Sequence, residues 1–169
     1  MVERSQKTPL YTPEERRRRD ASAWTLVQGI LAPVQFLIFL VSLVLVLRFL
    51  ATGEGLGAAT ASVVVKTVAL YTIMVTGCIW EREVFGVYLF APAFLWEDVF
   101  SMLVLALHTA YLVALVTEAL SPHRQMALAL AAYAAYVINA AQFLLKLRAA
   151  RRDEAAQRAE SSPCLALGQ

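Results

Sequence analysis

Residues 24–48 read WTLVQGILAPVQFLIFLVSLVLVLR, an apolar run that contains no charged side chain before Arg48. A helix needs about 20 apolar residues to cross the roughly 30 Å hydrocarbon core of a bilayer. This run therefore predicts a membrane-spanning helix. Three further apolar runs of similar length follow at residues 61–80, 99–120 and 126–145. The predicted fold is all-α, a single integral membrane domain built as a four-helix bundle.

The composition excludes an ordinary soluble domain. Hydrophobic residues make up 59% of the 169 residues and charged residues 17%, whereas soluble domains carry roughly 45–50% and about 25%. The net charge of +2 is small, and the sequence contains no nucleic-acid-binding motif, so nucleic acid is not an expected partner. The two cysteines, Cys78 and Cys164, are far apart and belong to no metal-binding pattern.

The basic residues predict the orientation of the chain. Residues 1–20 hold six of the fifteen Lys and Arg residues, and residues 146–160 hold five more. The positive-inside rule therefore places both termini in the cytoplasm. The polar segment 1–22 and the polar tail 148–169 are then cytoplasmic, and the tail is expected to lack regular structure.

The connection between the second and third predicted helices differs from the other two. It reads EREVFGVYLFAPAFLWED at residues 81–98 and mixes acidic and aromatic side chains with Pro92. It is too short to cross the membrane twice, so we interpret it as an interfacial or re-entrant segment on the cytoplasmic side. Trp80 and Trp96 are then the aromatic residues at the membrane boundary.

The third predicted helix carries a polar stripe. At 100° per residue, Glu97, Ser101, His108 and Tyr111 lie within about 80° of one another. Ionisable side chains at membrane depth tend to face the interior of a bundle. The stripe therefore predicts a polar path that runs from the cytoplasmic mouth of the bundle to His108 near the membrane midplane.

The other predicted helices carry polar side chains at similar depths, mostly in the cytoplasmic half. These residues are Gln28, Gln35, Glu81, Tyr136, Asn139 and Gln142, whereas the external half offers mainly Lys66 and Glu118. This asymmetry predicts a pocket that opens towards the cytoplasm or the inner leaflet.

Each of these polar residues also has a purely structural interpretation. His108, like the amide side chains, can hold helices together through hydrogen bonds. Glu97 and Asp98 can cap a helix and interact with its dipole. Lys66 can extend towards the membrane surface or pair with Glu118.

Several segments resemble one known family. The most distinctive are LYTPEER at residues 10–16, YLFAPAFLWED at residues 88–98 and ALHTAYL at residues 106–112. Together with the apolar runs between them, they resemble the 2-vinyl bacteriochlorophyllide hydratase family, also called chlorophyllide a 3-vinyl hydratase, over roughly residues 9–150.

The resemblance implies an activity and a location. It implies a hydro-lyase that adds water across the C3 vinyl group of a chlorophyllide to give a 1-hydroxyethyl group, during bacteriochlorophyll a synthesis. The implied location is the cytoplasmic or intracytoplasmic membrane of a phototrophic bacterium, and the implied partners are the chlorophyllide, the lipid bilayer and other enzymes of the same synthesis. No site residue is transferred from the family.

Hydration of a vinyl group needs a proton donor and a group that orients water. Carboxyl groups close to the membrane suit the donor role, and we expect Glu97 to fill it, with Asp98 and Glu81 as the other candidates. His108 is expected either to bind the magnesium of the substrate or to relay a proton. No nicotinamide, flavin, nucleotide or added metal is expected.

A planar, apolar substrate suits a pocket lined by aromatic and amide side chains. The expected substrate-binding residues are Gln28, Gln35, Tyr88, Phe94, Trp96, Ser101, Tyr111 and Asn139. Phe85 and Phe90 are expected to line the same pocket.

Two other functions remain open at this point. A non-catalytic pigment carrier or assembly factor would use the same pocket without proton chemistry. A small four-helix transporter would need a polar path that continues to the external side, where the sequence has few polar groups. Turnover distinguishes the hydratase from the carrier.

Overall fold

The computed structural model describes residues 10–161, and every regular element in that part of the chain is an α-helix. A short first helix precedes four long ones: α1 (Pro13–Ala21), α2 (Ala23–Thr52), α3 (Leu56–Phe85), α4 (Leu95–Val116) and α5 (Pro122–Ser161). The four long helices are each long and apolar enough to cross a membrane. The predicted all-α architecture is confirmed, with four helices that are candidate membrane spans.

Local sequence signals set several helix ends. Thr12 and Glu15 form a capping box, in which the Glu15 carboxylate accepts from the Thr12 amide at 2.8 Å and Thr12 Oγ1 accepts from the Glu15 amide at 3.2 Å. Gly53 and Gly86 end α2 and α3 with φ of 74° and 82°. Residues with a Cβ rarely adopt this left-handed conformation, so glycine suits both ends.

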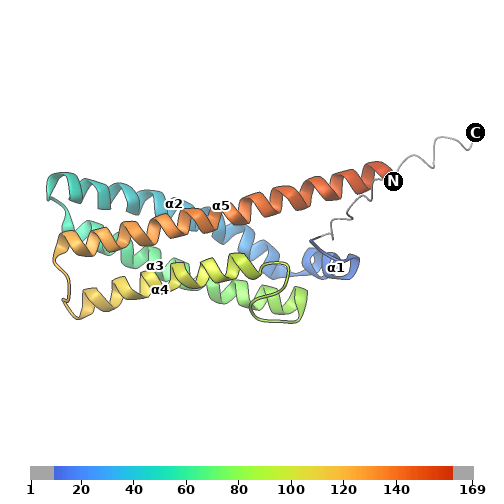
Figure 1. Cartoon of the computed structure of the whole chain (residues 1–169), viewed down its shortest axis with the longest axis horizontal. Helices are drawn as coiled ribbons and strands as arrows, with labels where there is room; N and C mark the ends of the chain where they lie inside the picture. Colours follow the sequence, from blue (N-terminus) through green and yellow to red (C-terminus); the bar gives the residue numbers. More distant parts are fainter. Residues whose placement is uncertain (1–9, 162–169) are drawn as a thin grey trace, which may run out of the picture.

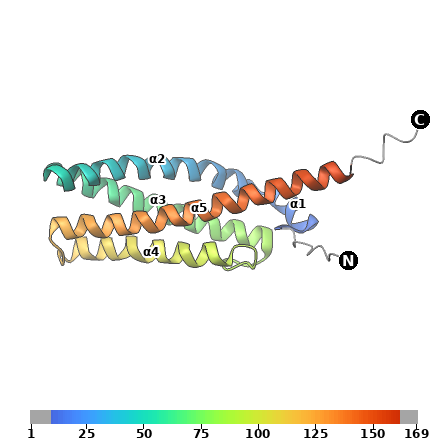
Figure 2. The ribbon, with the colours of Figure 1, turned by 45° about the horizontal axis from the view of Figure 1, so that its top comes forward.

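The long helices form two antiparallel hairpins, α2–α3 and α4–α5, which lie against each other (Figures 1 and 2). The tight turns of both hairpins lie at one end of the bundle, which we call the turn end. At the opposite end, α1 lies beside the connection 86–94, and α5 continues past the other helices. We call this the α1 end.

Polarity is distributed as expected for a bundle surrounded by lipid. Large apolar side chains on the outside are highly exposed, including Leu26 (68%), Val75 (62%) and Val116 (82%). In contrast, Lys66 and His108 are fully buried. Apolar groups on the surface and ionisable groups inside are typical of membrane-embedded helices.

The helices differ in length from the predicted spans. Regular structure continues beyond the apolar runs, and α5 extends about 60 Å at 1.5 Å per residue, roughly twice the hydrocarbon thickness. The expectation of an irregular tail over 148–169 is wrong as far as Ser161, because α5 includes these residues. Residues 162–169 lie outside the described part of the chain, as do residues 1–9.

The aromatic connection is also shorter than predicted. Glu81 belongs to α3, and Trp96, Glu97 and Asp98 belong to α4, so that only residues 86–94 are non-helical. The third span ends at Val116 instead of residue 120. The reason is local, since Glu118 adopts a positive φ of 53° in the turn that leads to α5.

Candidate functional site

The polar stripe of α4 is buried as a unit. Glu97, Ser101, His108 and Tyr111 all face the interior, with exposures of 7% or less. The helical spacing predicted this shared face correctly. Asp98 is buried as well, at 4% exposure, because the chain folds back over the start of α4.

Three carboxyl groups gather at the α1 end: Glu81 on α3 and Glu97 and Asp98 on α4. Glu97 forms an ion pair with Lys146 of α5, with Oε2 2.6 Å from Nζ. Asp98 has different partners, because its Oδ2 accepts a hydrogen bond of 2.8 Å from the Phe90 amide. Asp98 therefore does not cap α4, whose start has no side-chain cap hydrogen bond, but it lies in the first turn, where a carboxyl group interacts favourably with the helix dipole. It also holds the connection in place.

Asp98 also contacts Glu81 of the other hairpin through a side-chain hydrogen bond. Two carboxyl groups can share a hydrogen bond only when one of them carries a proton. The amide of Ala91 contacts Glu81 as well. The Glu81–Asp98 pair therefore brings carboxyl groups of the two hairpins together next to the aromatic connection, where the two groups can share one proton.

A second polar layer lies deeper in the bundle. Lys66 Nζ lies 3.7 Å from the centroid of the Tyr136 ring, and the His108 ring lies 5.9 Å from that of Tyr133. The Tyr133 hydroxyl bonds to Ser42 Oγ at 2.6 Å. We call Ser42, Lys66, His108, Tyr133 and Tyr136 the inner polar layer.

His108 has one occupied and one free ring nitrogen. Nδ1 lies 2.8 Å from the Val104 carbonyl oxygen, which can only accept, so Nδ1 carries the hydrogen. Nε2 is buried and has no hydrogen-bond partner in the described chain. Its lone pair is therefore available inside the bundle.

Several other buried polar atoms also lack a partner within the described residues. Together with His108 Nε2 on α4, such atoms lie on all four long helices: Gln35 Nε2 on α2, Lys66 Nζ and Glu81 Oε2 on α3, and Asn139 Oδ1 and Gln142 Oε1 on α5. Buried polar groups are nearly always hydrogen-bonded in folded proteins, and leaving one unpaired costs free energy. These atoms are therefore positions at which a water molecule or a polar ligand group would gain a hydrogen bond.

Other predicted site residues are engaged in helix packing. Gln28 donates to Thr76 Oγ1 at 2.7 Å and thereby links α2 to α3. Asn139 Nδ2 donates to Ser101 Oγ at 2.8 Å and links α5 to α4. The carbonyl of Tyr111 accepts from Gln125 at 2.7 Å.

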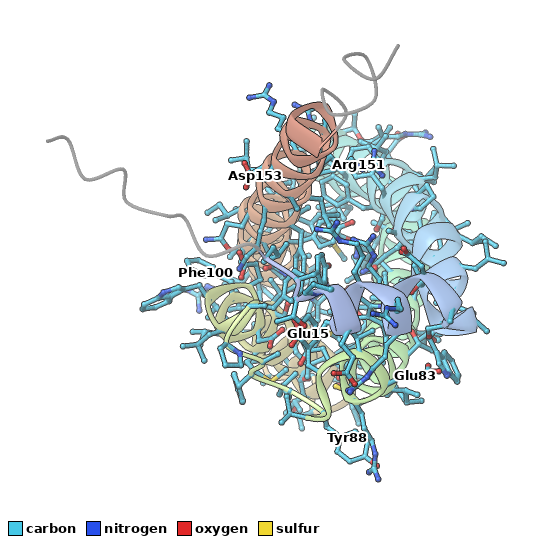
Figure 3. All side chains as sticks on the ribbon, turned by 90° about the vertical axis from the view of Figure 1, so that its right-hand side faces the viewer. Glu15, Glu83, Tyr88, Phe100, Arg151 and Asp153 are labelled. Carbon is cyan, nitrogen blue, oxygen red and sulfur yellow. The ribbon has the colours of Figure 1, made fainter. Side chains whose placement is uncertain are left out.

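The predicted aromatic lining is only partly inside. Figure 3 looks onto the α1 end, where α1 crosses the bundle with Glu15 and Tyr88 points away from it. Tyr88 is 55% exposed, Trp96 is 70% exposed and Phe90 is 43% exposed. Phe94, in contrast, is buried against Phe85 and other rings: Tyr11, Trp80 and Phe143.

The surroundings of Lys66 differ from those predicted from the sequence. Neither expected arrangement occurs, since its side chain does not reach the surface and Glu118 is exposed in a turn. The signal was nevertheless present, because Lys66 is a single cation in the middle of an apolar run. Such a residue is a functional candidate by default.

Fold and site together define a class, namely a polytopic helical membrane protein with ionisable groups in its interior. The chain belongs to the 2-vinyl bacteriochlorophyllide hydratase (BCHF) family, whose sequence model matches residues 11–149.

Two curated relatives carry the name 2-vinyl bacteriochlorophyllide hydratase. The protein from Cereibacter sphaeroides is 71% identical over 150 residues, covering 88% of this chain and 92% of that protein. The protein from Rhodobacter capsulatus is 69% identical over 148 residues, covering 88% and 86%. No solved structure is detectably similar.

Proposed function

We propose that this protein adds water across the C3 vinyl group of a chlorophyllide and forms a 1-hydroxyethyl group. The observation that carries the proposal is the identity of 69–71% to two hydratases over nearly nine-tenths of the chain. The membrane-embedded fold suits a flat, apolar substrate that partitions into lipid.

The reaction adds a proton to the terminal carbon of the vinyl group and a hydroxyl group to the adjacent carbon. The π electrons of the vinyl group take a proton at the terminal carbon, and the adjacent carbon becomes positively charged. Water bonds to that carbon and releases one proton to a base. The net change is the addition of one water, with no oxidation or reduction.

Within this proposal the Glu81–Asp98 pair supplies the proton. A shared proton between two carboxyl groups suits general acid catalysis, and the resulting carboxylate can later accept the proton of the attacking water. Glu97, the acid expected from the sequence, is less suitable because it is ion-paired with Lys146 at 2.6 Å. A carboxylate in an ion pair has no proton to donate.

His108 has a separate role in the proposal. Its free Nε2 faces the interior, where it can bind the magnesium of the substrate or accept a proton from water. Magnesium usually prefers oxygen ligands, and His108 would offer it one nitrogen. Ser101 and Asn139 lie between His108 and the carboxyl groups along α4 and α5 and can orient water.

The proposal includes neither a redox or nucleotide cofactor nor an added metal. It places the protein in the cytoplasmic or intracytoplasmic membrane of a phototrophic bacterium, with the α1 end towards the cytoplasm. Other enzymes of bacteriochlorophyll synthesis would then supply the substrate and remove the product.

The test uses membranes that contain only this protein and receive the vinyl chlorophyllide without any cofactor. We expect a product heavier by one water, and Glu81→Gln and Asp98→Asn should each lower its rate at least about 100-fold. Glu118→Gln, at an exposed turn residue, is the matched control and should keep the parent rate. Substrate binding without any product would instead support a pigment carrier and overturn the proposal.

A further inference from the structure

Lys66 is a buried amine without an anionic partner. Its side chain is fully buried in the middle of α3, and Nζ has no hydrogen-bond acceptor in the described chain. The closest favourable contact of Nζ is with the Tyr136 ring, whose centroid lies 3.7 Å away. A ring face attracts a cation but accepts none of the three ammonium hydrogens as a carboxylate would.

No carboxyl group described in the structure is placed to neutralise Lys66. Glu81 lies on the same helix, but 15 residues separate the two, which corresponds to about 22 Å along the axis. Glu118 is exposed beyond the end of α4. The ionisable side chains that face it from other helices are those of Tyr136 and His108, and neither supplies a negative charge.

A buried, unpaired ammonium group is costly at membrane depth. An apolar side chain of similar volume would pack there without this cost, so Lys66 is not explained by the stability of the empty bundle. Its side chain lies at the contact between the two hairpins, facing Tyr136 of α5. An anion that enters this contact would form a strong, charge-assisted hydrogen bond.

We propose that Lys66 binds the free propionate carboxylate of the chlorophyllide. This inference rests on the proposed function, because a chlorophyllide differs from a chlorophyll in having a free acid where the chlorophyll has an ester. Lys66 then serves as a substrate-binding residue that selects the acid over the ester.

The position of Lys66 also gives the substrate a direction. With the carboxylate held in the inner polar layer, the macrocycle extends from Lys66 towards the α1 end. The vinyl edge of the ring can then face the Glu81–Asp98 pair. His108 belongs to the same layer and presents Nε2 beside the ring.

The experiment compares the vinyl chlorophyllide with its methyl ester in nanodiscs that contain the full chain. Binding is measured from pigment fluorescence and does not depend on turnover. The parent should bind the acid at least about tenfold more tightly than the ester, since hydrogen bonds to charged groups are the strong ones. Lys66→Met should bind both compounds with the affinity that the parent has for the ester.

Two further variants act as controls. Lys66→Arg keeps the charge and should retain a preference for the acid, while Arg48→Met removes an exposed cation of α2 and should leave both affinities unchanged. If Lys66→Met fails to fold, equal affinity of the parent for the two ligands still overturns the inference.

The outcomes separate this inference from the proposed function. Equal affinity of the parent for acid and ester would overturn the inference, as would an acid preference that survives in Lys66→Met. A preference that depends on Lys66 without any hydration would support the binding role and overturn the hydratase.

Discussion

Glu97 and Asp98 are adjacent in sequence, yet they have different partners. Helical spacing placed Glu97 on the polar stripe correctly. It could not predict that Lys146, 49 residues later, would pair with Glu97, or that the connection would fold back so that Phe90 binds Asp98. Burial faces follow from local periodicity, whereas the partner of a charged group depends on contacts that form only in the folded chain.

This difference leads to a prediction for Glu97. Glu97→Gln should keep hydration within about tenfold of the parent, because its carboxylate is ion-paired and does not supply the proton. It should lower the unfolding temperature, because Lys146 then loses its partner. Product formation and thermal unfolding in detergent measure the two effects.

The double variant Glu97→Gln/Lys146→Met is the control for stability. It removes both charges and should recover part of the lost unfolding temperature. A loss of at least 100-fold in Glu97→Gln, together with an active Glu81→Gln, would show that Glu97 is the acid after all.

At the level of elements, the apolar runs predicted four helices but not their ends. Lipid thickness limits the apolar part of a helix, and nothing prevents a helix from continuing into water when the residues favour it. The segment RRDEAAQRAES at the end of α5 consists mostly of good helix formers. The polarity of this segment was therefore a poor guide to its structure.

The connection 86–94 offers a second prediction. Phe94 is 2% exposed and contacts the rings of Phe85 and Phe143, so Phe94→Ala should destabilise the protein by about 3–5 kcal/mol. Trp96→Ala removes a neighbouring aromatic side chain that is 70% exposed and should cost far less. Equal shifts of the unfolding temperature would show that the buried ring cluster does not anchor this connection.

For the whole molecule, the sequence predicted the number of apolar helices. It did not predict which side chains of one hairpin would contact which side chains of the other. The basic tails remain the basis for orientation.

We predict that cysteines placed at residues 5 and 160, in a Cys78→Ser/Cys164→Ser background, react only with reagents that enter the cytoplasm. A cysteine in place of Glu54, in the turn after α2, should react from outside.

Intact cells treated with a membrane-impermeant maleimide provide the measurement. Labelling of either end without permeabilisation would contradict the cytoplasmic orientation of both termini.

The two-hairpin design also bears on how the protein is made. Each hairpin satisfies its backbone hydrogen bonds within its own helices, so it can insert into lipid before the other is synthesised. Glu81 arrives with the first hairpin and Asp98 with the second. The proposed acid therefore does not exist in either half of the chain, and the nascent protein becomes an enzyme only when the second hairpin docks onto the first inside the bilayer.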